Sequence, residues 1–466
     1  MDDSAKKTLK RAYLVSPSRR RWVIAGAALA IGSLISVAGS SHAQEAGPQR
    51  SIQLVLPVPT GDYPIGTVSL HLIDRDRQDP YWSTPHAREL MVSVWYPAQR
   101  GQGNRAPWMP PEALAWFRPE LADFFMQAVS PPDAPPPGSP PPDSGLPPVQ
   151  TFGAADPSLL EDVRFPITHA RRGAPVLAFG HAAKGRYPVV LFSPGYGLNR
   201  EQGTALVEDL ASHGYIVVAI SHTYESAEVQ FPRGRVELGR HDLDMSPHLA
   251  VTLRRDDAKF VLDELREIAA GRKLDASGQA LPRGLGEVLD LTRVGMFGHS
   301  LGGATALQTM AHDSRVIAGI DLDGTVFSDL DPFNTPPPQI ESAMTQLALS
   351  VSDRPFMFMT SGSADPRRFF GPFLGSFWDN LSGWRRFLSL SRSSHYSYTD
   401  NELLLQQCIA AGIVPDFPPE ADLMDARRAV EVQRAYIRAF FDRWLRGRNG
   451  RLLDGPSARF PEIAFH

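Results

Sequence analysis

The chain has 466 residues, enough for one large catalytic domain or two smaller ones, and its 42% apolar and 9% aromatic content is typical of a globular protein. Residues 1–43 hold seven of the 47 basic and two of the 51 acidic residues, so the remainder carries 40 basic against 49 acidic side chains. Without a basic excess, the chain is not expected to bind nucleic acid.

The first 43 residues have the layout of an export signal. A basic region ends in SRRR at residues 18–21, an apolar run covers residues 22–39, and the sequence SHA precedes Gln44. The arginine pair before the apolar run is typical of twin-arginine export. The apolar run is also just long enough for an uncleaved membrane anchor, which is the alternative. We expect a cleaved signal and a mature catalytic domain of residues 44–466, periplasmic or secreted.

Two segments of different composition follow the signal. Residues 51–98 predict strands, because SIQLVLP, GTVSLHLID and ELMVSVWYP alternate apolar and polar residues and are rich in β-branched side chains. Residues 131–148 contain ten prolines in eighteen positions, a composition that excludes helix and central strand. We expect this Pro-rich segment to be a surface loop or linker inserted into the catalytic domain.

From residue 187 onward, short apolar runs alternate with stretches of helical periodicity. The runs carry few charges, as parallel strands covered on both faces do: YPVVLFS, YIVVAIS, RVGMFG, RVIAGIDLD, RPFMFMTS and WRRFLSLS. Apolar stripes at helical spacing lie between residues 258 and 268 and between residues 436 and 444. The alternation predicts an α/β fold, a doubly wound domain with a mainly parallel sheet, preceded by N-terminal antiparallel strands.

One run leads into the sequence GHSLGG, in which Ser300 is flanked by glycines. A tight turn from strand to helix strains its central residue, and glycines beside it remove the clashes that would forbid the turn. The serine hydroxyl then lies at a helix N-terminus, where free N–H groups stabilise a developing oxyanion. Gly-x-Ser-x-Gly alone is a weak pattern, but the strand before it and the small-residue helix after it favour a nucleophile elbow.

A serine nucleophile requires a base, and three histidines follow Ser300 in the chain. His312 falls in the helix after the turn, about 18 Å further along at the usual helical rise. His466 is the last residue. Elimination leaves His395, which follows the strand-like run ending in SLS, as the expected general base.

The acid of the triad has several candidates. Asp321 and Asp323 end the run RVIAGIDLD, and Asp365 follows the next strand-like run. Each suits the order serine, acid, histidine that α/β-hydrolases use. The spacing of the residues leaves the choice open.

Five stretches resemble the platelet-activating-factor acetylhydrolase family of plasma type, which belongs to the α/β-hydrolases. They are YPVVLFSPGYG, LVEDLASHGYIVVAISH, GHSLGGATALQTM, GIDLDGT and HYSYTD, within roughly residues 187–400. By matching of motifs, the resemblance implies a triad of Ser300, Asp323 and His395. It therefore favours Asp323 over Asp365.

The resemblance also implies an oxyanion hole and a substrate class. The oxyanion would be bound by the backbone N–H groups of Leu301 and Tyr196. Short-acyl phospholipids such as 1-alkyl-2-acetylglycerophosphocholine, or other short esters, would be cleaved without metal or cofactor, with transient contact to a lipid surface. The chain departs from the family in a proline where a histidine usually precedes the glycine turn and in its Pro-rich insertion, which leaves the substrate open.

Aromatic residues crowd the sequence RRFFGPFLGSFWDNLSGWRRF before His395. We expect most to pack in the core, with Phe377 and Trp378 as candidates for an acyl pocket. Cys408, the single cysteine, excludes an intrachain disulfide and is expected to be a small core residue. The sequence HDLDMSPH at residues 241–248 is a weak metal-site pattern, and we expect a polar rim there.

Other functions remain as alternatives. A polyester or cutinase-like hydrolase, or a lipase, would share the sheet and the elbow. The sequence IDLDGTVF imitates the first motif of haloacid-dehalogenase-like phosphatases, with Asp321 as nucleophile and Mg²⁺ as cofactor, but no lysine follows Lys273 to complete that site. A non-catalytic binding module that retains the fold is the remaining alternative.

Overall fold

The computed structural model describes residues 51–466 except residues 102, 130–155, 157, 178–185, 241–245, 273–274, 332–334, 363–370 and 419–420. The expected export signal and the Pro-rich segment at residues 131–148 therefore lie outside the described residues.

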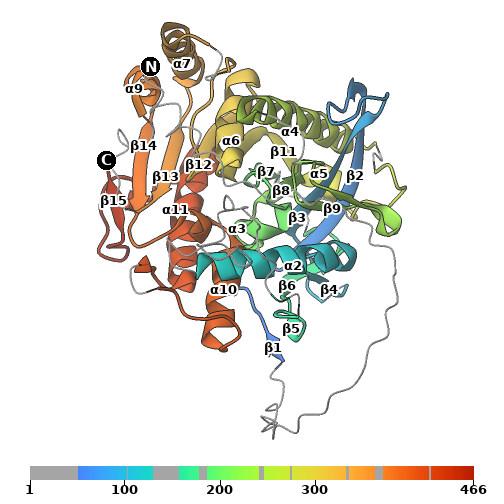
Figure 1. Cartoon of the computed structure of the whole chain (residues 1–466). Coiled ribbons are helices and arrows are strands. Elements are labelled where there is room, and N and C mark those ends of the chain that lie inside the picture. The colour runs from blue at the N-terminus through green and yellow to red at the C-terminus, as the bar shows by residue number, and fades with distance from the viewer. Residues whose placement is uncertain are drawn as a thin grey trace, which may run out of the picture.

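A single large sheet forms the centre of the described structure (Figure 1). Its eleven described strands have the order β15-β14-β13-β12-β11-β7-β8-β3-β2-β6-β4. The six strands from β14 to β8 are parallel to one another, as the apolar runs predict. Their bounds are β7 Tyr187–Ser193, β8 Ile216–Ser221, β11 Leu289–His299, β12 Val316–Leu322, β13 Phe356–Ser361 and β14 Arg385–Leu390.

Antiparallel strands extend the sheet on both sides, including the N-terminal ones that the alternating pattern predicts. β3 (Ala87–Pro97) pairs with β8, and β2 (Ile65–Gln78) pairs with β3 over most of its length. The prediction for SIQLVLP was wrong in extent, because β1 (Ile52–Gln53) has two residues and pairs outside the main sheet. The remaining strands are β4 Arg105–Pro107, β5 Val163–Arg164, β6 Ile167–Arg172, β9 Glu228–Gln230, β10 Val236–Leu238 and β15 Ile463–Phe465.

Helices cover both faces of the sheet, so the domain is doubly wound. One face packs against α4, α6, α7 and α9, all of which lie in the upper part of Figure 1. The other face packs against α3 and α11. Both predicted apolar stripes lie in these cores, at residues 258–268 of α4 and 436–444 of α11. The bounds are α3 Thr204–Ser212, α4 Pro247–Ala269, α5 Leu285–Val288, α6 Leu301–His312, α7 Pro337–Val351, α9 Gly371–Asn380 and α11 Ala426–Arg446.

A third apolar core joins α2 (Pro111–Ala128) to α10 (Asp400–Ala410), with Cys408 buried inside it. Phe124 of α2 meets Tyr396 edge to face, with ring centroids 4.5 Å apart. This contact places α2 beside the loop that carries His395. In the part of the chain that the structure covers, no helix has both the length and the apolar surface to span a membrane.

Candidate active site

Ser300 occupies the sharp junction between β11 and α6. Its φ of 55° and ψ of −122° are strained for a residue with a side chain. The neighbouring glycines make the turn possible: a Cβ on Gly302 would lie 2.0 Å from the carbonyl oxygen of Ser193, and one on Gly298 would lie 2.2 Å from the backbone of Gly302. The local geometry is therefore that of a nucleophile elbow.

The elbow is joined directly to β12, the strand that ends just before Asp323. The backbone N–H of Ser300 donates to the carbonyl oxygen of Leu322 at 2.8 Å, and Asp323 is the next residue. Asp323 adopts a left-handed φ of 54°, and its own N–H donates to the carbonyl of Met359 on β13 at 2.8 Å. The backbone thus fixes Asp323 with respect to Ser300.

Asp323 and His395 are hydrogen-bonded, with Nδ1 of His395 2.7 Å from Oδ2 of Asp323. The carboxylate is buried, whereas the His395 side chain is 42% exposed and so is accessible to a substrate. Ser361 also donates to Asp323, through its N–H at 2.6 Å and its hydroxyl at 3.0 Å. Burial alone would raise the pKa of Asp323, but the hydrogen bond from His395 and the Ser361 N–H lower it overall. The acid is therefore ionised at neutral pH.

The loop carrying His395 is held by a network of hydroxyl groups. His395 begins a short 3₁₀ helix, η4 (His395–Tyr398), which Ser394 caps by accepting from the Tyr396 N–H. Glu402 accepts hydrogen bonds from the hydroxyls of Ser394 at 2.5 Å and Ser397 at 2.7 Å. These bonds keep the loop in one conformation beside the elbow.

His299, just before the elbow serine, also contacts the catalytic histidine candidate. Its Nε2 lies 2.9 Å from the carbonyl oxygen of His395, and the two rings are 4.5 Å apart. Burial, and then the proximity of His395, lower the pKa of His299 to about 3, so it is neutral and donates from Nε2. Sequence reasoning missed this role, because His299 was considered only as one letter of the elbow motif.

The two residues expected to bind the oxyanion belong to the start of α6 and to the turn after β7. Leu301 is the first residue of α6, whose first-turn N–H groups have no acceptor within the helix. Tyr196 lies in the turn after β7, and the Cβ position of Gly302 is 2.6 Å from the carbonyl oxygen of Pro194 in that turn. The close approach places the turn against the start of α6.

The other acid candidates are in different positions. Asp321 is 1% exposed, lies within β12, and accepts from the N–H of Gly324 at 2.7 Å. Burial raises its pKa well above the ordinary value, which does not suit an ionised nucleophile. Asp365 lies outside the described residues.

The two histidines that were not expected to be the general base form other contacts. His312 ends α6 and contacts Asp329, and His466 contacts Ser389 at the C-terminus. Of the weak metal pattern, residues 241–245 fall outside the described residues. Among the described residues, no group of three or more His, Cys, Asp or Glu side chains could hold a metal ion.

The two acyl-pocket candidates belong to α9 and pack against the core of the sheet. Phe377 is fully buried, and both Phe377 and Trp378 contact the ring of Phe358 on β13. Trp378 also carries the guanidinium of Arg385 over its ring at 4.5 Å. These contacts are typical of core residues and do not support the predicted role in an acyl pocket.

The sheet order, the strained serine elbow and the acid–histidine pair together define an α/β-hydrolase. Comparisons with known proteins agree. Residues 178–333 match the family model described as platelet-activating factor acetylhydrolase, isoform II. A probable 1-alkyl-2-acetylglycerophosphocholine esterase from Arthroderma benhamiae is 25% identical over 88% of this chain and 93% of its own length.

Two further relatives differ in the coverage of the match. A platelet-activating factor acetylhydrolase from Bos taurus is 33% identical over 30% of this chain and 36% of its own length. The solved structure of a ferulic acid esterase from Streptomyces cinnamoneus is 32% identical, with a TM-score of 0.61 over 88% of this chain and 99% of that one. The chain is a carboxylic ester hydrolase, and over residues 178–333 it is similar to the platelet-activating factor acetylhydrolase isoform II family.

Proposed function

We propose that the chain hydrolyses short-acyl esters through a triad of Ser300, His395 and Asp323. His395 accepts the proton of the Ser300 hydroxyl, whose oxygen attacks the ester carbonyl. The ionised Asp323 fixes the imidazole with its proton on Nδ1 and stabilises the imidazolium that forms. His395 then protonates the leaving alkoxide, and water activated by the same histidine releases the acid from the acyl-enzyme.

The charge that develops on the carbonyl oxygen requires donors that are already in place. We assign this role to the backbone N–H groups of Leu301 and Tyr196, which belong to the start of α6 and the turn beside it. The observation that carries the proposal is the short hydrogen bond from His395 to the buried Asp323. Asp323 directly follows Leu322, whose carbonyl oxygen accepts from the Ser300 N–H.

For the substrate, we propose esters with a short acyl chain, and in particular 1-alkyl-2-acetylglycerophosphocholine or related lipids at a lipid surface. The supporting observation is the relative from Arthroderma benhamiae, whose name states this activity and which aligns over nearly its whole length. An aromatic ester is the second candidate, because the ferulic acid esterase is more similar in sequence over as large a share of this chain.

The triad is tested by comparing ester hydrolysis by S300A, D323N and D365N, with the folded state of each checked by circular dichroism. We expect S300A to lose at least about 10⁴-fold in kcat, D323N to lose nearly as much, and D365N to remain close to the wild type. Loss of activity in D365N with an active D323N would transfer the acid role to Asp365. An active S300A would refute the serine mechanism.

The substrate is tested with one preparation and a panel of esters. The panel contains nitrophenyl esters of increasing chain length, 1-alkyl-2-acetylglycerophosphocholine as monomers and in vesicles, methyl ferulate, and a polyester film. The proposal expects the highest kcat/KM for the acetyl lipid and a steep fall with acyl length. A preference for methyl ferulate would instead indicate an esterase for aromatic esters, and a preference for the film would indicate a polyester hydrolase.

We also propose that residues 1–43 direct export and are removed. The supporting features are the basic region, the apolar run and the SHA sequence before Gln44. N-terminal sequencing of the protein recovered from a bacterial periplasm should begin at Gln44. An intact N-terminus in the membrane fraction would favour the anchor instead.

A further inference from the structure

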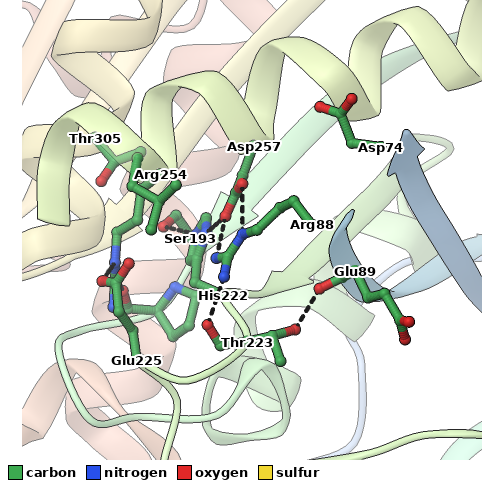
Figure 2. A network of polar contacts seen from close by, with 12 residues as sticks. Asp74, Arg88, Glu89, Ser193, His222, Thr223, Glu225, Arg254, Asp257 and Thr305 are labelled. Carbon is green, nitrogen blue, oxygen red and sulfur yellow. Dashed lines mark hydrogen bonds and ion pairs between the residues drawn. The ribbon is translucent and has the colours of Figure 1, made fainter. Parts of the chain in front are cut away.

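A buried arginine contacts the turn that contains Tyr196. Arg254 of α4 is fully buried, and its Nη1 donates to the carbonyl oxygen of Pro194 at 2.5 Å. Its Nη2 donates to the carbonyl oxygen of Gly195 at 3.2 Å. Glu225 balances the charge by accepting from Nε at 2.6 Å, and Figure 2 shows the two side chains lying against each other. A planar guanidinium can hold three acceptors in this way, and a lysine cannot.

These bonds determine the direction of the peptide group that precedes Tyr196. The carbonyl of Gly195 and the N–H of Tyr196 belong to the same planar trans peptide, so they point in opposite directions. Because the carbonyl faces the Arg254 guanidinium in the interior, the N–H must face away from it. The N–H of Leu198 also donates to the Gly195 carbonyl, at 3.1 Å, which closes the turn around this peptide.

A second set of buried groups holds the residue where the turn begins. Ser193 lies 2.9 Å from Nε2 of His222, whose Nδ1 lies 2.9 Å from Asp257, and Arg88 donates to Asp257 (Figure 2). The arrangement imitates a catalytic triad, but its side chains are fully buried and cannot meet a substrate. Burial, and then the nearby Arg254, lower the pKa of His222 to about 3. A neutral His222 bonded to Asp257 through Nδ1 accepts from the Ser193 hydroxyl.

We propose that Arg254 is a positioning residue for ester hydrolysis, which holds the peptide between Gly195 and Tyr196 so that the Tyr196 N–H faces the oxyanion. The inference rests on the proposed serine mechanism and extends it to a side chain that touches no substrate. Glu225 serves as the counter-charge that allows the guanidinium to be buried there. Arg254 therefore acts on the transition state through Tyr196, without affecting the binding of the ground state.

The test compares kcat and KM of R254K and of the double variant R254M/E225Q. The double variant removes both charges, so no unpaired carboxylate is left buried. We expect kcat to fall about 10²-fold in the double variant, as for the loss of one oxyanion donor, with KM within about threefold of the wild type. R254K should lose less, because the ammonium keeps the positive charge and can still donate to the turn, although it lacks the planar fork that fits Glu225 and both carbonyls.

R434K is the matched control. Arg434 is also buried and donates to the carbonyl oxygens of Pro57, Val58 and Ala205, none of which belongs to the elbow or to the turn of Tyr196. Its replacement by lysine should reduce the midpoint of thermal unfolding to a similar degree as R254K, while kcat stays unchanged. A fall of kcat in R434K equal to that in R254K would mean that loss of stability alone explains the effect.

A second readout separates positioning from stability. Affinity for a trifluoromethyl ketone, which forms a tetrahedral adduct with the serine, should fall in parallel with kcat in the Arg254 variants. Affinity for an unreactive ester analogue should not change. Unchanged kcat and unchanged ketone affinity in R254M/E225Q would refute the role of Arg254 even if S300A is inactive, whereas an active S300A would refute the mechanism on which it rests.

Discussion

Replacement of Asp323 by asparagine tests the electrostatic core of the site. Oδ1 accepts from the Ser361 N–H at 2.6 Å, and an amide nitrogen cannot accept there, so the new side chain must keep its oxygen in that position. The NH₂ group then takes the place of Oδ2, 2.7 Å from Nδ1 of His395. To avoid two opposed donors, the imidazole must move its proton to Nε2.

This tautomer cannot accept the proton of Ser300, and the negative charge that stabilises the imidazolium is absent. We therefore expect kcat to fall by about 10³- to 10⁴-fold, or about 4–5.5 kcal/mol of transition-state stabilisation. The protein should remain folded, because the Ser361 hydroxyl, 3.0 Å from Oδ2, can rotate to accept from the new NH₂ group.

The assay is the steady-state hydrolysis of nitrophenyl acetate by D323N and by S361A. S361A retains the carboxylate and the tautomer, so its loss in kcat should be far smaller than that of D323N. A D323N protein with kcat within about tenfold of the wild type would refute the assignment of the acid.

Further predictions concern stability. Burial lowers the pKa of both His222 and His299 to about 3, from about 6.5 in the unfolded chain, so the unfolded state binds more protons below pH 6.5. The free energy of unfolding should fall between pH 6.5 and pH 3, by up to about 2 kcal/mol per histidine at pH 5, and urea titrations at pH 7 and 5 that agree would contradict this. Gly302→Ala should destabilise the fold by more than about 2 kcal/mol, because its Cβ would meet a carbonyl oxygen at 2.0 Å. Gly375→Ala in α9, where the Cβ meets nothing within 4 Å, should be neutral or stabilise the fold by up to about 1 kcal/mol. If thermal denaturation showed equal effects of Gly302→Ala and Gly375→Ala, the packing described for the elbow would be wrong. Arg88→Met should cost about 3–5 kcal/mol in urea denaturation, since it leaves the buried Asp79 without its cation and the buried Asp257 with Arg77 alone; a loss below about 1 kcal/mol would contradict this.

The sheet could be predicted from the sequence because its central strands are covered on both faces. Five of the six continuous apolar runs, such as YPVVLFS at residues 187–193, coincide with observed strands to within two residues. The sixth, RVGMFG, begins at residue 293, four residues after the start of β11. The elbow could also be predicted, because the glycines around Ser300 are required by contacts that any tight strand-to-helix junction makes.

Other elements have no comparable local signal. The helix α2 carries Pro119 inside it and packs in a separate small core with α10, so its existence depends on contacts with distant residues. The strand predicted at residues 51–57 was wrong in extent for the opposite reason. The alternating pattern is present, but in the described structure none of these residues pairs with the main sheet.

The contacts that position the site residues could not be predicted from the sequence either. His299 and Arg254 contact backbone carbonyls of His395 and Gly195, and Ser361 contacts the carboxylate of Asp323. In each case folding brings together partners that are distant in the sequence. Charged residues such as Arg254 in an otherwise amphipathic helix are ordinarily exposed. Only the fold reveals that this one is buried against a turn.

The most direct test of the central claim is to label the protein with a fluorophosphonate and locate the modified residue by mass spectrometry. We expect one phosphonyl group per chain, on Ser300, formed rapidly in the wild type and much more slowly in H395A, with ester hydrolysis lost in proportion to labelling. Labelling of another residue, or complete loss of hydrolysis with Ser300 unmodified, would contradict it.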